Sequence, residues 1–372
     1  MATLLIPISP DELSAEWLNQ ALKSTGVIKQ SNISSFTTEP VGNGKGFHGT
    51  LVRVFLTYDI QEEGAPKTLI SKHVATAPEN HMIALALRFY EREVNFYRHA
   101  AEKSLLRSPI PYYSDIDEAC EKFVILMEDF GESSVDQLKG TTTEICYAVI
   151  NELARFHAQF ATIVQNTKME WLPDAAEEDY VALTSAIYGG SLDAALENFG
   201  DHFSPAMREL AVNMADKIPQ LMQDRVAEGV TMIHGDYKLD NLFMGKLPQR
   251  EGFPESGLAV IDWQMCTKAE CVADVAYHMC SLDIETRREI ETKALRDYHE
   301  TLTSSGVEGY PFDTFMIQYR SALLFSLVYA VGLAGTSDKG NERGMELCRA
   351  LLDRTLAAID DNNCSEVMPL PR

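Results

Sequence analysis

The chain has 372 residues, 45% of them hydrophobic, so it can bury a large core and form two lobes or domains. Its 55 acidic and 32 basic residues leave a formal net charge of −23. A chain with this net negative charge would be repelled by nucleic acid and by an anionic membrane surface, so we expect neither as a binding partner. The charge slightly favours a cationic small molecule, although most of it is expected to be solvated surface.

The sequence contains seven cysteines, at positions 120, 146, 266, 271, 280, 348 and 364. They form no Cys-x-x-Cys pair, and we interpret them as reduced thiols of a cytoplasmic protein. Cys266, Cys271 and Cys280 are close together, but their spacing fits no zinc site. The chain begins without the features of a signal peptide. Its most apolar segment, residues 321–335, is too short to span a bilayer and suits a core helix.

The chain begins with the pattern of a helix start, Ser-Pro-Asp-Glu, in which Ser9 is the predicted N-cap and Glu12 closes a capping box. Leu13, Trp17 and Leu22 would form the apolar face of that helix. From there the pattern changes to strands.

A glycine-rich segment, residues 41–49, precedes a run of β-branched and aromatic residues at 51–58. Within it, Gly44, Gly46 and Gly49 match the spacing of two different phosphate-binding loops. The dinucleotide-binding version requires a helix next, whereas residues 51–58 predict a strand, so a hairpin over nucleotide phosphates fits better. Taken alone, the motif would favour an ordinary hairpin turn.

Lys72 lies in the next predicted strand, residues 68–74. A lysine there either solubilises an edge strand or contacts the α- and β-phosphates of a nucleotide. Taken alone it would favour the first role, but the glycine loop before it and Asp236 after it favour the second. Residues 84–105 predict a helix on which Glu93 lies among aromatic and aliphatic side chains. An unpaired carboxylate would be costly there, so we expect a partner such as Lys72. Glu91 is the alternative to Glu93 as the partner of Lys72, unless it lies on a solvated helix face.

The second half of the chain is predicted to be mostly helical. Thr141 and Glu144 form a capping box that opens a helix ending near Val164, and His157 beside its apolar stripe is expected to be a hydrogen-bonded core histidine. Residues 174–201 are less regular, and we interpret them as a substrate-facing insertion. Further helices are predicted at residues 205–227, 284–304, 312–333 and 342–360. A polar loop at 332–344 either rims an acceptor pocket or is simply exposed.

The clearest chemical signal lies in residues 231–264. Short apolar runs end near Asp236 and at Asp262, and Asn241 follows Asp236 by five positions. This is the spacing of a kinase catalytic loop followed by a metal-binding loop. Phosphoryl transfer with Mg²⁺ needs one carboxylate to orient the attacking hydroxyl, and an amide and a second carboxylate to hold the metal. The sequence therefore predicts a kinase of a small alcohol.

With these residues in place, the chain resembles the aminoglycoside phosphotransferase and choline/ecdysteroid-kinase-like superfamily over about residues 41–276. The resemblance rests on residues 234–241, His-Gly-Asp-Tyr-Lys-Leu-Asp-Asn, and 260–264, Val-Ile-Asp-Trp-Gln, and it leans toward the ecdysteroid-kinase-like branch. It implies an α+β, protein-kinase-like fold of two lobes. Residues 1–128 would form a small antiparallel-sheet N-lobe, and residues 129–372 a larger, mostly helical C-lobe.

The resemblance also implies a role for each motif residue. Asp236 would be the catalytic base, with Lys238 near the transferring phosphate. Asn241 and Asp262 would hold Mg²⁺. Lys72 would contact the ATP phosphates, braced by Glu93 and covered by the glycine loop. Asp274 matches a structural aspartate that holds the catalytic loop, and His234 would orient that loop.

Residues 122–128 predict a buried strand that ends at Asp129. In a two-lobe kinase the connector passes the adenine here, so the backbone of Met127 and Glu128 is expected to contact the nucleotide. The triplet Asp129-Phe130-Gly131 looks like the kinase metal triplet, but it precedes the catalytic loop. Because this order is wrong for a metal site, we interpret it as a hinge.

The expected function is therefore an ATP- and Mg²⁺-dependent O-phosphotransferase acting on a hydroxyl of a small molecule. The alternative is a catalytically silent, nucleotide-binding scaffold, which the presence of Lys72, Glu93, Asp236, Asn241 and Asp262 disfavours. A protein kinase is disfavoured too, because no activation segment separates Asp262 from Asp274. The sequence leaves the acceptor and the oligomeric state open.

Overall fold

The structure is a computed structural model that describes residues 4–41, 49–132, 135–167, 169–247, 250–253, 256–337 and 340–369. Gly44 and Gly46 of the predicted phosphate loop lie outside these ranges, whereas Gly49 lies within them. The chain divides into two compact units. The first contains residues 1–132 and 261–265, and the second contains residues 133–260 and 266–372. The short segment 261–265 thus belongs to the first unit although its neighbours in sequence do not.

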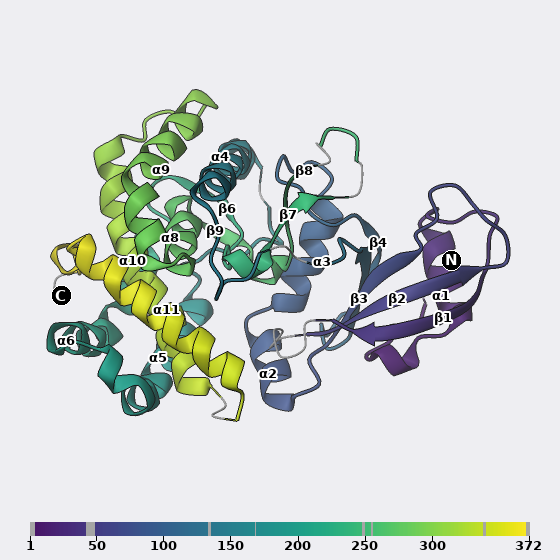
Figure 1. Cartoon of the computed structure of the whole chain (residues 1–372), viewed down its shortest axis with the longest axis horizontal. Helices are drawn as coiled ribbons and strands as arrows, with labels where there is room; N and C mark the ends of the chain where they lie inside the picture. Colours follow the sequence, from purple (N-terminus) through teal and green to yellow (C-terminus); the bar gives the residue numbers. More distant parts are fainter. Residues whose placement is uncertain are drawn as a thin grey trace. The chain divides into compact units, whose positions relative to one another are not determined.

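The first unit is built on an antiparallel sheet whose five described strands run in the order β1-β2-β3-β5-β4 (Figure 1). The strands are β1 (Ile33–Pro40), β2 (Thr50–Tyr58), β3 (Thr68–His73), β4 (Pro111–Ile116) and β5 (Phe123–Glu128). Strand β3 pairs with β2 on one side and with β5 on the other. Lys72 on β3 is therefore on an inner strand, which excludes the edge-strand interpretation of this residue.

The helices of the first unit are η1 (Pro10–Glu12), α1 (Ala15–Ser24), α2 (Pro78–Ala86), α3 (Phe89–His99) and η5 (Trp263–Met265). The predicted start at Ser9 is wrong, because η1 is a short 3₁₀ turn and the Ser9 side chain makes no capping bond. The cap of α1 is Ser14, whose hydroxyl accepts from the Trp17 N–H at 3.1 Å. Helix α1 buries Leu18 and Leu22 in the same apolar cluster as residues of β2, β3 and β5.

The single helix predicted at residues 84–105 is two helices in the structure. Helix α2 ends at Ala86, and α3 begins at Phe89. Between them Arg88 has a φ of +57°, in the left-handed region. A residue in that conformation cannot continue a right-handed helix, so the chain changes direction before α3 begins.

Helices dominate the second unit, in agreement with the predicted α+β fold class. Its longer helices are α4 (Thr143–Asn166), α5 (Glu178–Phe199), α6 (Pro205–Met214), α7 (Ile218–Asp224), α8 (Val272–Ser281), α9 (Ile284–Ser304), α10 (Phe312–Thr336) and α11 (Glu342–Asp361). The short 3₁₀ turns are η2 (Gly200–His202), η3 (Ala215–Lys217), η4 (Leu239–Asn241) and η6 (Cys364–Val367). Helix α4 is capped by Thr142, one residue after the predicted Thr141.

Two predictions for this unit are wrong. The helix predicted at 205–227 is interrupted by η3, and α7 then restarts with a proline in its first turn, where the missing N–H costs nothing. Residues 174–201, predicted to be irregular, contain the regular helix α5. Helix α5 tolerates Gly189 and Gly190 because packing on α10 outweighs their low helix propensity. The two helices lie so close that a Cβ at Gly335 of α10 would be 2.4 Å from the carbonyl oxygen of Ser191 on α5.

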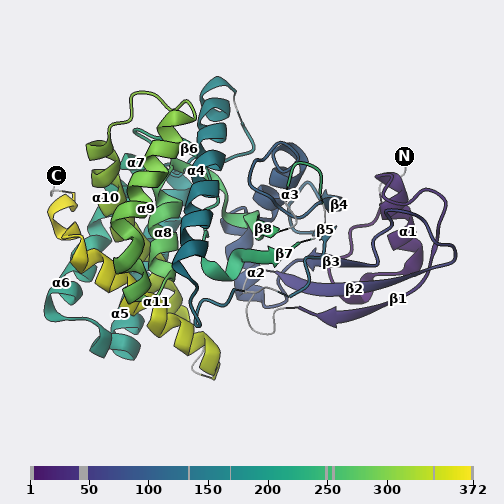
Figure 2. The ribbon, with the colours of Figure 1, turned by 45° about the horizontal axis from the view of Figure 1, so that its top comes forward.

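Helix α10 is the most apolar helix of the second unit. By length and composition it passes as a membrane span, but 56% of its most apolar window is buried inside the protein. It packs against α5, α8 and α11, and Figure 2 shows α8, α9 and α10 side by side. The burial supports the predicted core helix.

Two small antiparallel sheets deliver the motif residues. Strand β6 (Val230–Ile233) pairs with β9 (Thr267–Glu270), and β7 (Leu242–Lys246) pairs with β8 (Ser256–Val260). His234 follows directly on β6, and Asp262 comes two residues after β8. Each functional loop therefore starts from a hydrogen-bonded strand end.

The two candidate caps of the first helix can be compared directly. Ser14→Ala removes the acceptor of the Trp17 N–H and is expected to lower the free energy of unfolding by ~1 kcal/mol. Ser9→Ala should leave it unchanged, because that side chain caps nothing. Urea unfolding of both variants measures the difference, and equal effects would contradict the assignment of Ser14 as the cap.

Candidate active site

In the first unit a buried lysine binds two carboxylates. The Lys72 Nζ lies 2.6 Å from Glu93 Oε2 and 2.7 Å from Asp262 Oδ1. Lys72 and Glu93 are almost completely buried, with 3% and 1% of their surfaces exposed. The expected pairing of Glu93 with Lys72 is therefore present, and Asp262 joins it from a distant part of the sequence.

This cluster joins one ammonium group to two carboxyl groups, of which Glu93 is buried whereas 26% of the Asp262 side chain is exposed. Burial alone would lower the pKa of Lys72, but the Asp262 and Glu93 carboxylates outweigh it and raise that pKa. Burial raises the pKa of the Glu93 carboxyl, and the nearby Asp262 charge adds to this. Lys72 therefore stays protonated, and it is the lysine that allows a carboxyl group such as Glu93 to lie in this buried place.

Gly49, the last glycine of the predicted phosphate loop, lies against this cluster. A Cβ at this position would be 3.1 Å from Lys72 Cε and 3.3 Å from the His73 carbonyl oxygen. A side chain there would therefore press directly on Lys72. Glu91, the alternative partner, pairs with Arg88 instead, at 2.9 Å.

The segment that carries Asp262 is fixed from the side of α3. Trp263 is fully buried, and its ring stacks on Phe96 with a centroid distance of 3.8 Å and an interplanar angle of 5°. Phe96 lies one turn after Glu93 on the same helix. Asp262 itself has a φ of +68°, a conformation that costs a non-glycine residue free energy and persists only where the surroundings impose it. The stack is one such restraint.

The strand end predicted to contact adenine is largely occupied by the protein's own bonds. The Glu128 N–H donates to the Ile110 carbonyl at 2.8 Å, so it is unavailable to a nucleotide. The Glu128 side chain is buried and accepts from Arg107 at 3.2 Å. The Met127 sulfur accepts from the Tyr97 hydroxyl at 3.6 Å. The expected backbone contact of Met127 and Glu128 with adenine therefore cannot include the Glu128 N–H.

The triplet Asp129-Phe130-Gly131 has a structural partner of its own. Arg53 on β2 binds the Asp129 carboxylate with Nε at 2.7 Å and Nη2 at 3.1 Å, and it also donates to the Gly131 carbonyl. Burial opposes ionisation of Asp129, but the bonds from Arg53 prevail and hold its pKa below the usual value. The Asp129 carboxylate thus has a structural partner within the first unit, and the hinge interpretation of this triplet stays a prediction.

In the second unit the predicted catalytic loop forms one polar cluster. Lys238 Nζ lies 2.9 Å and 2.8 Å from the two carboxylate oxygens of Asp236. Asn241 Nδ2 donates to Asp236 Oδ2 and to the Asp236 carbonyl, each at 2.9 Å. Because the amide nitrogen of Asn241 faces Asp236, its oxygen is the group left to bind something else. His234 Nδ1 accepts from the Asp236 N–H at 3.2 Å, consistent with a role in orienting the loop.

Asp274 holds the backbone of that loop. Its two oxygens accept from the His234 N–H at 2.6 Å and the Gly235 N–H at 2.8 Å. His157 binds the same carboxylate through Nε2 at 3.2 Å, and its Nδ1 pairs with the Tyr298 hydroxyl at 2.6 Å. Burial would raise the pKa of Asp274, but the bond and charge of His157 and the backbone bonds lower it. His157 is thus the expected hydrogen-bonded core histidine.

Two residues near these motifs, Tyr277 and Gln264, have partners that were not predicted from the sequence. Tyr277 lies one turn after Asp274 on α8, and its hydroxyl interacts with the Asp236 carboxylate. Burial raises its pKa, with a smaller contribution from Asp236, so the hydroxyl stays protonated. Gln264 donates from Nε2 to Asp262 Oδ2 at 3.1 Å. The one-turn spacing from Asp274 could have indicated Tyr277, whereas nothing in the sequence assigns a partner to Gln264.

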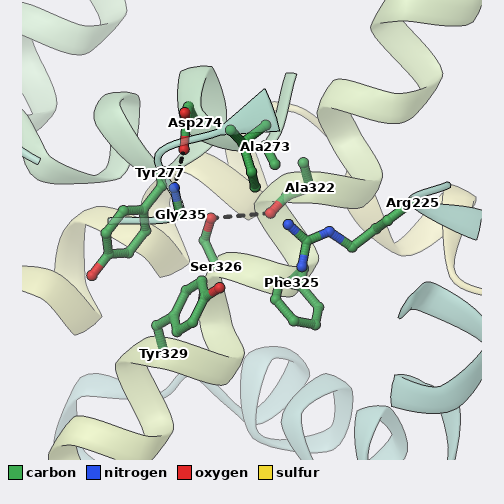
Figure 3. A pocket seen from close by; sticks show the side chains of 10 residues that line it. Arg225, Gly235, Ala273, Asp274, Tyr277, Ala322, Phe325, Ser326 and Tyr329 are labelled. Carbon is green, nitrogen blue, oxygen red and sulfur yellow. Dashed lines mark hydrogen bonds between the residues drawn. The ribbon is translucent and has the colours of Figure 1, made fainter. Parts of the chain in front are cut away.

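A small cavity lies behind the catalytic loop (Figure 3). Gly235 and Asp274 border it, Arg225 reaches into it, and Ser326 and Tyr329 of α10 close it. Its volume of about 10 Å³ is roughly what one water molecule needs. An acceptor molecule does not fit there, so the cavity belongs to the support of the loop.

The donor groups of the two loops fit a hard divalent cation. Carboxylate and carboxamide oxygens, as in Asp262 and Asn241, are the protein ligands that Mg²⁺ takes. Within the described ranges no three His, Cys, Asp or Glu side chains gather into a metal-binding group.

The hydrogen bonds from the loop backbone to Asp274 should contribute to the free energy of unfolding. Asp274→Asn keeps one acceptor oxygen but turns an amide nitrogen toward the second N–H, so we expect a loss of ~1.5–3 kcal/mol at neutral pH. The pKa of Asp274 is lowered in the folded state, so its stabilisation is present above about pH 4 and is lost as the pH falls below that. Urea unfolding at pH 7 and at pH 3 should show the difference between the two proteins shrinking in acid. A constant difference would contradict this assignment.

Comparison with solved structures supports the fold. A choline kinase from Cryptosporidium parvum Iowa II has a TM-score of 0.55 and 13% identity, covering 96% of this chain and 98% of its own. A Plasmodium vivax ethanolamine kinase has a TM-score of 0.52 and 10% identity, covering 88% and 83%. A mutant aminoglycoside 2'-phosphotransferase-IIIa in complex with GDP has a TM-score of 0.51 and 12% identity, covering 95% and 98%. These likenesses confirm the predicted protein-kinase-like fold.

No curated protein sequence matches the chain. The model of the ecdysteroid kinase-like family, however, matches residues 43–306, which include every predicted catalytic and metal-binding residue. The match covers well over half of the chain, and the resemblance expected from the two motifs is confirmed. The chain belongs to the ecdysteroid kinase-like family.

Proposed function

We propose that this protein is an ATP- and Mg²⁺-dependent O-phosphotransferase that acts on a hydroxyl group of a small molecule. The observation that carries the proposal is the loop cluster in which Asp236 is held by Asn241, Lys238 and, through the backbone, Asp274. A carboxylate fixed in this way can accept a hydrogen bond from an attacking hydroxyl. The family membership and the Lys72–Glu93 pair support the same reaction class.

In this mechanism the acceptor hydroxyl donates to Asp236 and attacks the γ-phosphate of ATP in line with the leaving oxygen. Lys238 lies beside Asp236 and would stabilise the negative charge on the transferring group. Lys72 would bind the α- and β-phosphates. Asn241 and Asp262 would hold Mg²⁺, which when bound neutralises phosphate charge. Catalysis is then mainly positioning and electrostatic stabilisation.

The acceptor we favour is a cationic alcohol. Choline, ethanolamine and aminoglycosides, the compounds that name the similar structures, carry both a hydroxyl and a positive charge. The net charge of −23 is compatible with such a substrate. A panel of amino alcohols, aminoglycosides, sugars and steroids, screened for nucleoside diphosphate release, tests the preference for a cationic acceptor. Running the panel with ATP and with GTP tests the proposed use of ATP.

Asp236→Ala is expected to lower kcat by roughly 10²–10⁴-fold, because the hydroxyl-orienting carboxylate is lost. Nucleotide affinity should stay close to that of the parent protein. Asp216→Ala, which removes an exposed carboxylate of the same unit, serves as the control and should keep full activity. Full turnover in the Asp236 variant would refute the assignment, and nucleotide binding without turnover in the parent protein would favour the silent scaffold.

Asp262→Asn is expected to weaken the binding of Mg²⁺ in the presence of nucleotide by ~10-fold or more, about 1.4 kcal/mol. The reason is that a neutral amide replaces the only charged metal ligand we propose. Calorimetric titration measures the affinity. Asp129→Asn is the matched control, since its carboxylate pairs with Arg53 and should not affect the metal. An unchanged metal affinity in the Asp262 variant, or a loss in the Asp129 variant, would count against the proposed site.

A further inference from the structure

The side chain of Gln264 is a buried amide of which only one end has a partner. It lies two residues after Asp262 and is 6% exposed. Its Nε2 donates to Asp262 Oδ2 at 3.1 Å. A carboxylate only accepts hydrogen bonds, so the nitrogen must face Asp262 and Oε1 must point elsewhere. That oxygen is buried and has no hydrogen-bond donor within the part of the chain that the structure describes.

Such an oxygen is expensive to keep. A buried acceptor without a partner costs about 1–3 kcal/mol, and an apolar side chain of the same shape would avoid this cost. Buried polar atoms left without protein partners commonly bind a water or an ion. The orientation of Gln264 therefore points to a ligand that supplies what the protein does not.

The catalytic loop contains the same arrangement. There Asn241 donates from its amide nitrogen to the Asp236 carboxylate at 2.9 Å, and its amide oxygen is left for other partners. Gln264 and Asp262 repeat this pairing of a carboxamide with a carboxylate in the first unit. Carboxamide oxygens are acceptors that suit Mg²⁺ and the water molecules it retains.

The amide is also held in place from several sides. The preceding Trp263 is stacked on Phe96, and Asp262 is tied through its other oxygen to Lys72. The backbone at Asp262 has a positive φ. With its neighbours fixed and its own nitrogen bonded to Asp262, Gln264 holds Oε1 in one orientation.

We propose that Gln264 is a positioning residue of the metal site: its nitrogen orients the Asp262 carboxylate, and its Oε1 accepts a hydrogen bond from water on the divalent ion that Asp262 binds. The inference rests on the proposed function, because it assumes that Asp262 holds a metal. It assigns to Gln264 a part in metal affinity that is separate from nucleotide binding and from the chemistry at Asp236.

The decisive substitutions are Gln264→Met and Gln264→Asn in the full chain. Methionine keeps the length but removes both polar groups, so the affinity for Mn²⁺ should fall ~10–100-fold. Asparagine keeps both polar groups but is one methylene shorter, so neither group reaches its partner and the affinity should fall by ~10-fold or more. Gln20→Met on the exposed face of α1 is the control and should leave the affinity unchanged.

The readout is Mn²⁺ binding in the presence of ADP, followed by electron paramagnetic resonance, with ADP binding in the presence of a chelator measured alongside. Metal-free ADP affinity should be the same in all variants. If Gln264→Met binds Mn²⁺ as the parent protein does, the inference is overturned. If that variant does not fold, Gln264→Asn decides: an Mn²⁺ affinity equal to that of the parent protein overturns the inference.

The same titration separates this inference from the proposed function. A parent protein that binds no Mn²⁺, or binds it equally well after Asp262→Asn, would sink the proposed metal site as a whole. Binding that is lost in the Asp262 variant but retained in Gln264→Met would overturn only the role of Gln264.

Discussion

The first unit depends on one lysine that neutralises carboxylates from two distant parts of the chain. Lys72 and Asp262 are separated by 190 positions in the sequence, and Glu93 comes from α3. Transferring such charges out of water costs several kcal/mol each, so the cluster is stable only while its members remain together. The stacking of Trp263 on Phe96 and the missing side chain at Gly49 serve this requirement, one by fixing a neighbour and the other by leaving space.

In the second unit the loop that carries Asp236 is buried at His234 and Asp236 and is fixed by residues outside it. Gly235 has a φ of +82°, which lets the chain turn sharply between His234 and Asp236. Asp274 satisfies two backbone N–H groups at this turn, and His157 fixes Asp274 from α4. The Asp236 carboxylate, which we propose orients the acceptor hydroxyl, is thus positioned by residues to which the proposal assigns no chemical role. Such indirect support lets a short loop keep its geometry.

The sequence carried the family resemblance because the catalytic and metal motifs are local. Asp236 and Asn241 belong to one short loop, and their contact follows from five positions of spacing. The pairing of Glu93 with Lys72 was predictable as well, since a carboxylate on an aromatic helix face requires a cation. Other features depend on tertiary packing. The positive φ of Arg88 that splits the helix has no residue signature, because arginine rarely adopts it. Helix α5 forms through packing on α10, against the preference of its own glycines.

The pairing of Gln264 was not predictable for a related reason. Glutamine is found mostly on protein surfaces, and only its burial beside Asp262 gives it a specific partner. Its role is indicated only by its hydrogen bonds in the folded protein, where the amide nitrogen has a partner and the amide oxygen has none among the described residues.

The return of residues 261–265 to the first unit has a consequence for biogenesis. A ribosome makes Lys72 and Glu93 long before it makes Asp262 and Trp263, and domains begin to fold during synthesis. Until then the nascent sheet and α3 lack the indole that covers Phe96 and the second carboxylate for the lysine. The amino-terminal part can therefore complete its packing only after most of the chain has been translated. Excising residues 1–132 would release a fragment that never reaches its finished state.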